Sequence, residues 1–297
     1  MRLRLFIAII AASVLTGVAQ TTTWFPYPTA PETLPIGRPR ANYIVAHFWD
    51  RCPWKQAYTS QKRMEETIRD FADYIPHASA DTVFMSINEL IKHTSKRPQD
   101  LAALLRMAEA TFNSDTAYAY SDRVFLPFAQ AGAKAKKLAP AEKEHYAHMA
   151  KVLDATSEGR TLPRAMATRA DGTKFAINDT TPGVGAYIYF LEEPDDLASR
   201  MDRVMLSANV SLNRLIDAGL VKPMLLYVGT PDQSWWDSVS SLKGWTVAAM
   251  PDAGQYFDLR RKPAIYMTDN KMEVISKFIP TSLLIANCEQ LVKTLNR

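Results

Sequence analysis

The sequence contains little cysteine: its 297 residues include only Cys52 and Cys288. That separation excludes a Cys-x-x-Cys redox motif. The sequence also lacks a Gly-x-Ser-x-Gly hydrolase turn, a His-Glu-x-x-His zinc motif and a phosphate-binding P-loop. Gly183-Val184-Gly185 lacks the further glycine of a dinucleotide loop and precedes a strand pattern, so it predicts a turn. No cofactor is therefore expected.

A strong charge imbalance is also absent. Thirty-five basic and 31 acidic residues give a formal net charge of +4, and the basic residues are scattered along the chain. This pattern argues against a nucleic-acid partner. The hydrophobic content of 47% is typical of globular proteins and is sufficient for a core.

The N-terminus lacks an apolar run long enough to span a membrane. Arg2 and Arg4 precede an apolar run at 5–15, and Gly17 and Ala19 follow it. This layout predicts a signal peptide at residues 1–19, cleaved after Ala19, and export to the periplasm or beyond the cell. The alternative is a membrane anchor, but a spanning helix needs about 20 apolar residues. No membrane span is expected after cleavage.

The two cysteines can form a disulfide after export, or they can remain unpaired. Cys52 precedes Pro53, a helix-stop signal. Cys288 recurs at helical spacing with three leucines, Leu284, Leu291 and Leu295. This spacing predicts that Cys288 lies on the apolar face of the last helix.

The remaining chain changes character once. Residues 20–38 are rich in proline and threonine and predict an extended lead-in. Residues 39–156 carry apolar side chains at helical spacing and predict a bundle of about five to seven helices. A linker at Thr156–Pro163 separates them from residues 157–297, where short β-rich runs alternate with helical patterns. The predicted fold class is α + α/β, with an all-helical domain followed by an α/β domain.

The expected strands of this second domain are at 173–177, 185–191, 223–228, 245–249, 264–267 and 272–278. The expected helices are at 197–216, 233–242 and 282–295. Alternating strands and helices predict a sheet with a parallel portion, and the turn-like Thr268-Asp269-Asn270 predicts a final hairpin.

Three segments resemble one family. Residues 41–50 read Ala-Asn-Tyr-Ile-Val-Ala-His-Phe-Trp-Asp, residues 189–199 read Tyr-Phe-Leu-Glu-Glu-Pro-Asp-Asp-Leu-Ala-Ser, and residues 256–269 read Tyr-Phe-Asp-Leu-Arg-Arg-Lys-Pro-Ala-Ile-Tyr-Met-Thr-Asp. The chain resembles bacterial envelope thioredoxin-like proteins of the thiol-disulfide oxidoreductase type that carry an N-terminal helical domain of unknown function. The resemblance implies a thioredoxin-like domain at 157–297.

The resemblance also implies an altered redox site. In that family the first strand of the core runs into Asn-Pro-Asp-Cys-x-x-Cys at the start of a long helix. Asp196 and Ser199 stand where the two cysteines would be. Pro263 corresponds to the cis-proline that faces this turn, with an ordinary trans-proline as the alternative. An aspartate cannot form a mixed disulfide, and a serine cannot resolve one.

Five residues form a candidate binding surface around the altered site. Pro194, Asp195 and Lys262 flank the altered site and form a candidate binding surface with Trp235 and Trp236. Core packing is expected to account for one of the two tryptophans.

His145 and His148 could share a helix face and bind a metal, but a solvated charged helix explains them better, and no metal site is expected.

Three functional readings follow. The first is a non-catalytic binding or accessory module that recognises an unknown protein or peptide partner in the cell envelope. The second is an oxidoreductase that uses Cys52 as a relocated thiol, which requires an exposed thiol with a lowered pKa. The third makes the helical domain the functional part and the α/β domain its scaffold.

Overall fold

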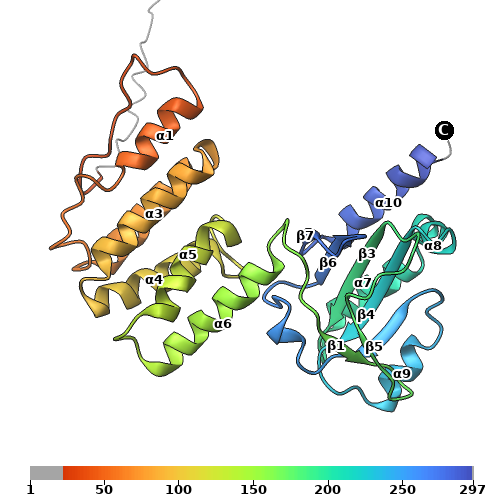
Figure 1. Cartoon of the computed structure of the whole chain (residues 1–297). Helices are drawn as coiled ribbons and strands as arrows, with labels where there is room; N and C mark the ends of the chain where they lie inside the picture. Colours follow the sequence, from red (N-terminus) through yellow and green to blue (C-terminus); the bar gives the residue numbers. More distant parts are fainter. Residues whose placement is uncertain (1–22, 296–297) are drawn as a thin grey trace, which may run out of the picture.

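The computed structural model describes residues 23–295, arranged as a helical part followed by a sheet with helices (Figure 1). The predicted signal peptide at 1–19 lies outside the described residues. Within 23–295, no helix combines the length and apolar character needed to cross a membrane.

The helical part contains six α-helices, which confirms the predicted bundle. They are α1 (Arg38–His47), α2 (Gln61–Tyr74), α3 (Ala80–Thr94), α4 (Pro98–Phe112), α5 (Asp122–Lys134) and α6 (Pro140–Thr156), with a 3-10 turn η1 (Ile75–His77) after α2. Ser60, Ser79 and Ser121 each cap a helix by accepting a hydrogen bond from a backbone N–H three residues on. Proline opens α4 and α6, where its missing N–H costs nothing.

The lead-in packs against this bundle. The Trp24 indole donates to the Thr67 hydroxyl at 2.8 Å, and the Tyr27 hydroxyl donates to Asp70 at 2.7 Å. Phe25 is buried in the same core as Phe48. The described part of the segment thus contributes to the core of the helical part.

The second part is built on a seven-stranded sheet in the order β2-β1-β5-β4-β3-β6-β7. Its strands are β1 (Met166–Thr168), β2 (Lys174–Ala176), β3 (Ala186–Glu192), β4 (Val221–Tyr227), β5 (Thr246–Ala249), β6 (Ala264–Asp269) and β7 (Val274–Lys277). Strands β3, β4 and β5 are parallel, while β6 and β7 form an antiparallel hairpin. The predicted α/β class, parallel portion and final hairpin are confirmed.

Two local predictions were wrong. The helix expected at 197–216 is two helices, α7 (Leu197–Ser207) and α8 (Val210–Asp217), because the Asn209 side chain caps α8 by accepting from Leu212 N at 2.8 Å. Strand β1 was not expected, since three residues are too few to show alternation.

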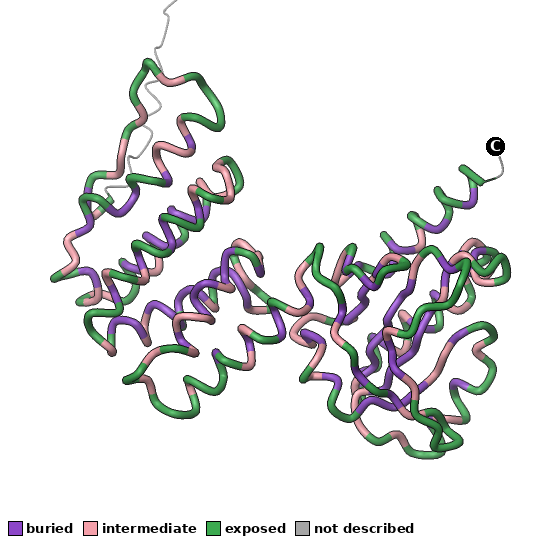
Figure 2. Tube along the Cα trace, viewed as in Figure 1, coloured by how far each residue is buried: buried purple, intermediate pink, exposed green. Residues whose placement is uncertain are grey.

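Side chains of β3 alternate between two cores. Ile188 and Phe190 face the side covered by α7, α8, α9 (Gln233–Val239) and α10 (Thr281–Leu295). Tyr187, Tyr189 and Leu191 face the other side, which the segment at 250–259 helps to cover. In Figure 2 the strands are accordingly mostly purple, and the outer helices carry much of the green.

The buried face of α10 differs in part from the predicted one. Leu284 and Cys288 are buried as predicted, and Val292 joins them. Leu291 and Leu295 are exposed, because the inward stripe follows the 3.6-residue period from 288 to 292.

Candidate functional site

The turn that the resemblance predicts to be an altered redox site lies where β3 ends and α7 begins. Asp196 is the N-cap of α7: one carboxylate oxygen accepts from the Ser199 backbone N–H at 3.1 Å, and the other accepts from Ser199 Oγ at 2.6 Å. Both residues are buried. The preceding Asp195 has a φ of 58°, an uncommon left-handed conformation for a non-glycine residue, and it is exposed beside Pro194.

Lys262, which precedes Pro263 in a segment distant in sequence, lies beside the same turn. The Lys262–Pro263 peptide bond is cis. Lys262 Nζ lies 3.2 Å from a Glu193 carboxylate oxygen and 3.7 Å from Asp196 Oδ2. Burial by itself raises the pKa of Asp196, but the Ser199 hydrogen bonds and the Lys262 charge outweigh it and hold that pKa below its usual value. The turn therefore carries an ionised carboxylate paired with an ammonium group.

Beneath the turn lies a buried carboxylate that sequence reasoning missed. Glu192 is fully buried and accepts from the Trp235 indole N–H at 2.8 Å. Arg203 Nε lies 2.9 Å from its other oxygen, and Arg200 Nε lies 3.7 Å from the first. The sequence does contain a signal for it: Glu192 ends an otherwise apolar strand. A glutamate in such a place is expected to be buried, and a buried charge needs partners.

This arrangement changes the expected binding surface. Trp235 is 5% exposed and belongs to the core, so it is not part of a binding surface. Its indole N–H is already donated to Glu192. Trp236 is partly exposed and meets the Trp235 ring edge-on at 5.0 Å. Trp235 is thus part of the core, and Trp236 is the more accessible of the two. The residues of the turn that can reach a partner are Pro194, Asp195 and Lys262.

The two thiols lie in different cores. Cys52 is buried in the helical part and Cys288 lies on the buried face of α10, and both are free, so the disulfide alternative is wrong for this structure. Burial raises the pKa of Cys52 to about 12 and also raises that of Cys288. Neither thiol has the lowered pKa of a reactive cysteine.

The histidine pair does not form a metal centre with carboxylates. His145 Nε2 lies 2.9 Å from a Glu109 oxygen on the protein surface. Over residues 23–295 there is no group of three or more histidine, cysteine, aspartate or glutamate side chains arranged to hold a metal ion.

A cluster of four charges joins the helical part to the sheet. Asp258 accepts from Arg260 Nε at 2.6 Å and lies 3.0 Å from Lys277 Nζ. Asp122, the first residue of α5, pairs with Lys277 and lies 3.4 Å from Arg260 Nη2. Arg260 also donates to the backbone carbonyl of Asn113. This ionic cluster fixes the segment that leads into Pro263.

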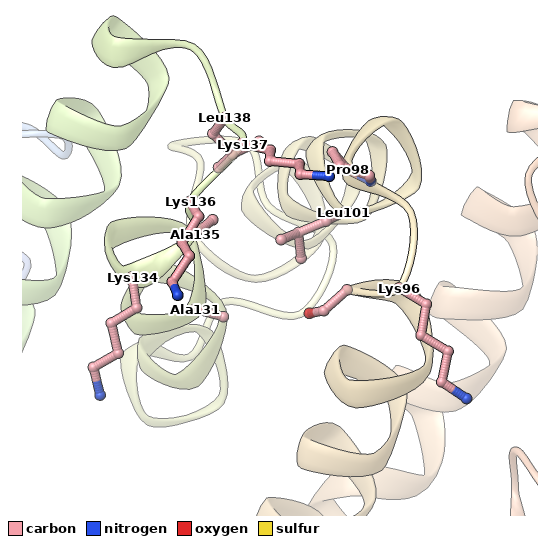
Figure 3. A pocket seen from close by; sticks show the side chains of 10 residues that line it. Lys96, Pro98, Leu101, Ala131, Lys134, Ala135, Lys136, Lys137 and Leu138 are labelled. Carbon is pink, nitrogen blue, oxygen red and sulfur yellow. The ribbon is translucent and has the colours of Figure 1, made fainter.

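Two sizeable cavities lie away from Asp196. One of about 420 Å³ opens between the start of α4 and the end of α5, with Leu101 inside it and lysines around it (Figure 3). Another of about 530 Å³ lies beside the ionic cluster and is lined by Asp122, Arg160 and Lys277 among others.

Comparisons with known proteins support the fold. Residues 13–155 match a family model described as a domain of unknown function (DUF5106). The solved structure of a thioredoxin-like protein from Bacteroides caccae ATCC 43185 aligns with 91% of this chain and 99% of its own, at 17% identity and a TM-score of 0.75. The chain therefore has a helical part followed by a thioredoxin-like fold.

Two further solved structures each align with less than half of this chain. The thioredoxin domain of a thiol-disulfide oxidoreductase from Bacteroides vulgatus covers 46% of this chain and 98% of its own, at 14% identity and a TM-score of 0.38. The alignment with a thiol:disulfide interchange protein from a Bacteroides species covers 47% of this chain and 92% of that protein, at 14% identity and a TM-score of 0.38. No functionally curated protein matches the chain.

Proposed function

We propose that this chain is an exported accessory protein of the bacterial envelope, whose thioredoxin-like domain binds a protein or peptide partner without thiol-disulfide exchange. The observation that carries the proposal is the Asp196–Ser199 pair at the start of α7. Exchange requires a thiolate that attacks a disulfide. In this turn the corresponding groups are a carboxylate and a hydroxyl, and they are hydrogen-bonded to each other.

The turn is stable in its present form. A carboxylate at a helix N-terminus is favoured by the helix dipole and by the free backbone N–H groups. The Lys262 charge favours the same ionised state. The accessible residues of the turn include Pro194, and the exposed Asp195 and the 47% exposed Lys262 side chain offer one charge of each sign to a partner.

The alternative of a relocated thiol has less support. Cys52 would have to be exposed and ionised near neutral pH, whereas it is 6% exposed with a pKa of about 12. A thiol in that state supplies almost no thiolate at neutral pH.

Insulin reduction and dithiol exchange test the absence of chemistry. We expect the wild-type protein and Cys52→Ala to be inert, and Asp196→Cys with Ser199→Cys to gain exchange activity. A matched control, Asp237→Cys with Ser240→Cys, creates the same spacing at the end of α9 and should gain far less. Wild-type activity that disappears in Cys52→Ala would refute the proposal.

A peptide array tests the binding role. The wild-type protein should bind a subset of extended peptides, and Lys262→Glu should weaken that binding at least tenfold. Lys271→Glu, an exposed lysine in the β6–β7 turn, is the matched control and should bind like wild type. Binding that is equal in all three proteins would exclude the turn as the binding site.

A further inference from the structure

The outer face of α7 is an uninterrupted apolar stripe. Its four large members are Leu197 (68% exposed), Met201 (62%), Val204 (61%) and Met205 (52%). Ala198 and Ala208 are also exposed; Ala198 widens the stripe beside Leu197, and Ala208 extends it at the C-terminal end. The opposite face of the helix, with Ser199, Arg203 and Leu206, is buried. The helix therefore has apolar side chains both toward the core and toward solvent.

Such a surface is unusual for a protein that works alone. At these exposures each large side chain offers roughly 100 Å², so the stripe presents on the order of 500 Å² of apolar surface with its alanines. That lies near the upper end of the largest patch on a typical monomer. Two such stripes in contact would bury on the order of 1,000 Å², the lower limit for a specific protein interface.

The spacing of the stripe fits a second copy of the same helix. Leu197, Met201, Val204 and Ala208 alternate in steps of four and three residues, which is the apolar seam of a two-helix coiled coil. With Leu197 and Val204 at d positions and Met201 and Ala208 at a positions, Arg200 takes a g position and Met205 an e position beside the seam. In a parallel pair the Arg200 stem and the Met205 side chain therefore extend the apolar contact, and the Arg200 charge stays at its edge.

The flanks of the stripe disfavour a lipid surface. Helices that lie on membranes carry several lysines or arginines along the polar face. Here the stripe is bordered by one cation, Arg200, and one anion, Asp202, and the Arg200 guanidinium is only loosely paired, 3.7 Å from Glu192.

We propose that two copies of this chain associate through parallel α7 helices, with the seam centred on Met201. Because Asp196 caps the N-terminus of α7, the pair places two Asp196–Lys262 turns at the same end of the interface. The inference does not depend on what those turns bind.

Sedimentation velocity between 2 and 200 µM tests the pairing. The wild-type mass should rise toward twice that of one chain over this range, and Met201→Lys should weaken association at least tenfold. Met85→Lys is the matched control, because Met85 is 69% exposed on α3, and it should associate like wild type. A wild-type protein that stays monomeric to 200 µM, or a dimer unaffected by Met201→Lys, would overturn the proposal.

Disulfide trapping tests the direction of the helices. Equal positions face each other in a parallel pair, so Leu197→Cys should cross-link between copies under mild oxidation, while Met85→Cys should not. In an antiparallel pair centred on Met201 the two 197 positions would lie roughly 12 Å apart along the helices and could not bridge. A dimer that fails to cross-link through Leu197→Cys would exclude the parallel arrangement.

Discussion

Replacing Asp122 by asparagine should test whether the ionic cluster stabilises the contact between the two parts of the chain. The cluster holds two carboxylates, Asp122 and Asp258, and two cations, Arg260 and Lys277. Lys277 and Asp258 are almost fully buried, so water cannot compensate a lost charge. Asp122→Asn leaves the cluster with an excess positive charge.

The expected cost follows from the burial. Removing one partner of a buried ion pair costs about 3–5 kcal/mol, because the other charge stays desolvated and unpaired. Asp122 is also in the first turn of α5, where its negative charge interacts favourably with the helix dipole. Loss of that charge costs a further amount of about 0.3–1 kcal/mol. We therefore expect Asp122→Asn to lower the free energy of unfolding by about 3 kcal/mol or more.

A double-mutant cycle separates the two contributions. Lys277→Met should be destabilising by itself, but in the Asp122→Asn background it restores charge balance. The double variant should therefore recover about 2 kcal/mol relative to the sum of the single changes, within the range found for directly coupled residues. The helix-dipole loss at Asp122 is common to both backgrounds and cancels in the cycle.

Urea unfolding followed by tryptophan fluorescence measures these changes. Glu66→Gln is the matched control, because Glu66 and Lys62 form a solvent-exposed pair at 3.9 Å that should contribute less than about 1 kcal/mol. If Asp122→Asn shifts the unfolding midpoint no more than Glu66→Gln, or if the cycle shows no coupling, the cluster does not stabilise the contact.

The same cluster predicts a pH dependence. Burial raises the pKa of Asp258, but hydrogen bonds from Arg260 and the charge of Lys277 outweigh this and lower that pKa in the folded state. A lowered folded pKa adds stability above the unfolded value of about 3.9, and the stability is lost as the pH falls through the folded value. Asp258→Asn should therefore flatten the acid side of the stability curve below about pH 4, measured by urea unfolding at a series of pH values.

Three further changes test the packing. Glu192→Ala should cost about 3–5 kcal/mol, because it leaves Arg203 buried without its carboxylate; a loss below about 1 kcal/mol in urea unfolding would contradict the ion pair. Gly132→Ala should lower stability by about 1–3 kcal/mol, since its Cβ would lie 2.6 Å from the Tyr146 ring, and an unchanged melting temperature would count against this close contact of α5 and α6. Cys52 should react with a thiol reagent only after denaturation, and fast labelling of the native protein would contradict its burial.

The sequence predicted elements wherever periodicity extended over several residues. The helical part and the run at 185–191 are long enough to show their period, and the structure has helices and β3 there. The break between α7 and α8 was missed because Asn209 acts through its own side-chain cap, which interrupts no apolar pattern. Similarly, no local pattern distinguishes Trp235 from Trp236, because their difference arises from a glutamate 43 residues earlier.

Local contacts of the turn could be expected from sequence, whereas contacts between distant residues could not. Asp196 and Ser199 are three residues apart, so a helix N-cap could be expected from sequence. The ionic cluster joins residues up to about 155 positions apart, and no spacing rule indicates which of the chain's many charged residues meet. Contacts of this kind depend on the tertiary fold.

The segment from Asp258 to Pro263 connects the two parts of the molecule to the turn. Arg260 is held by Asp258 and by the Asn113 carbonyl of the helical part, and only two residues later Lys262 pairs with Asp196. One residue separates Arg260 from Lys262, so the contacts of the helical part and those of the turn meet in one short segment. The helical part should therefore be retained whenever the binding properties of the turn are measured.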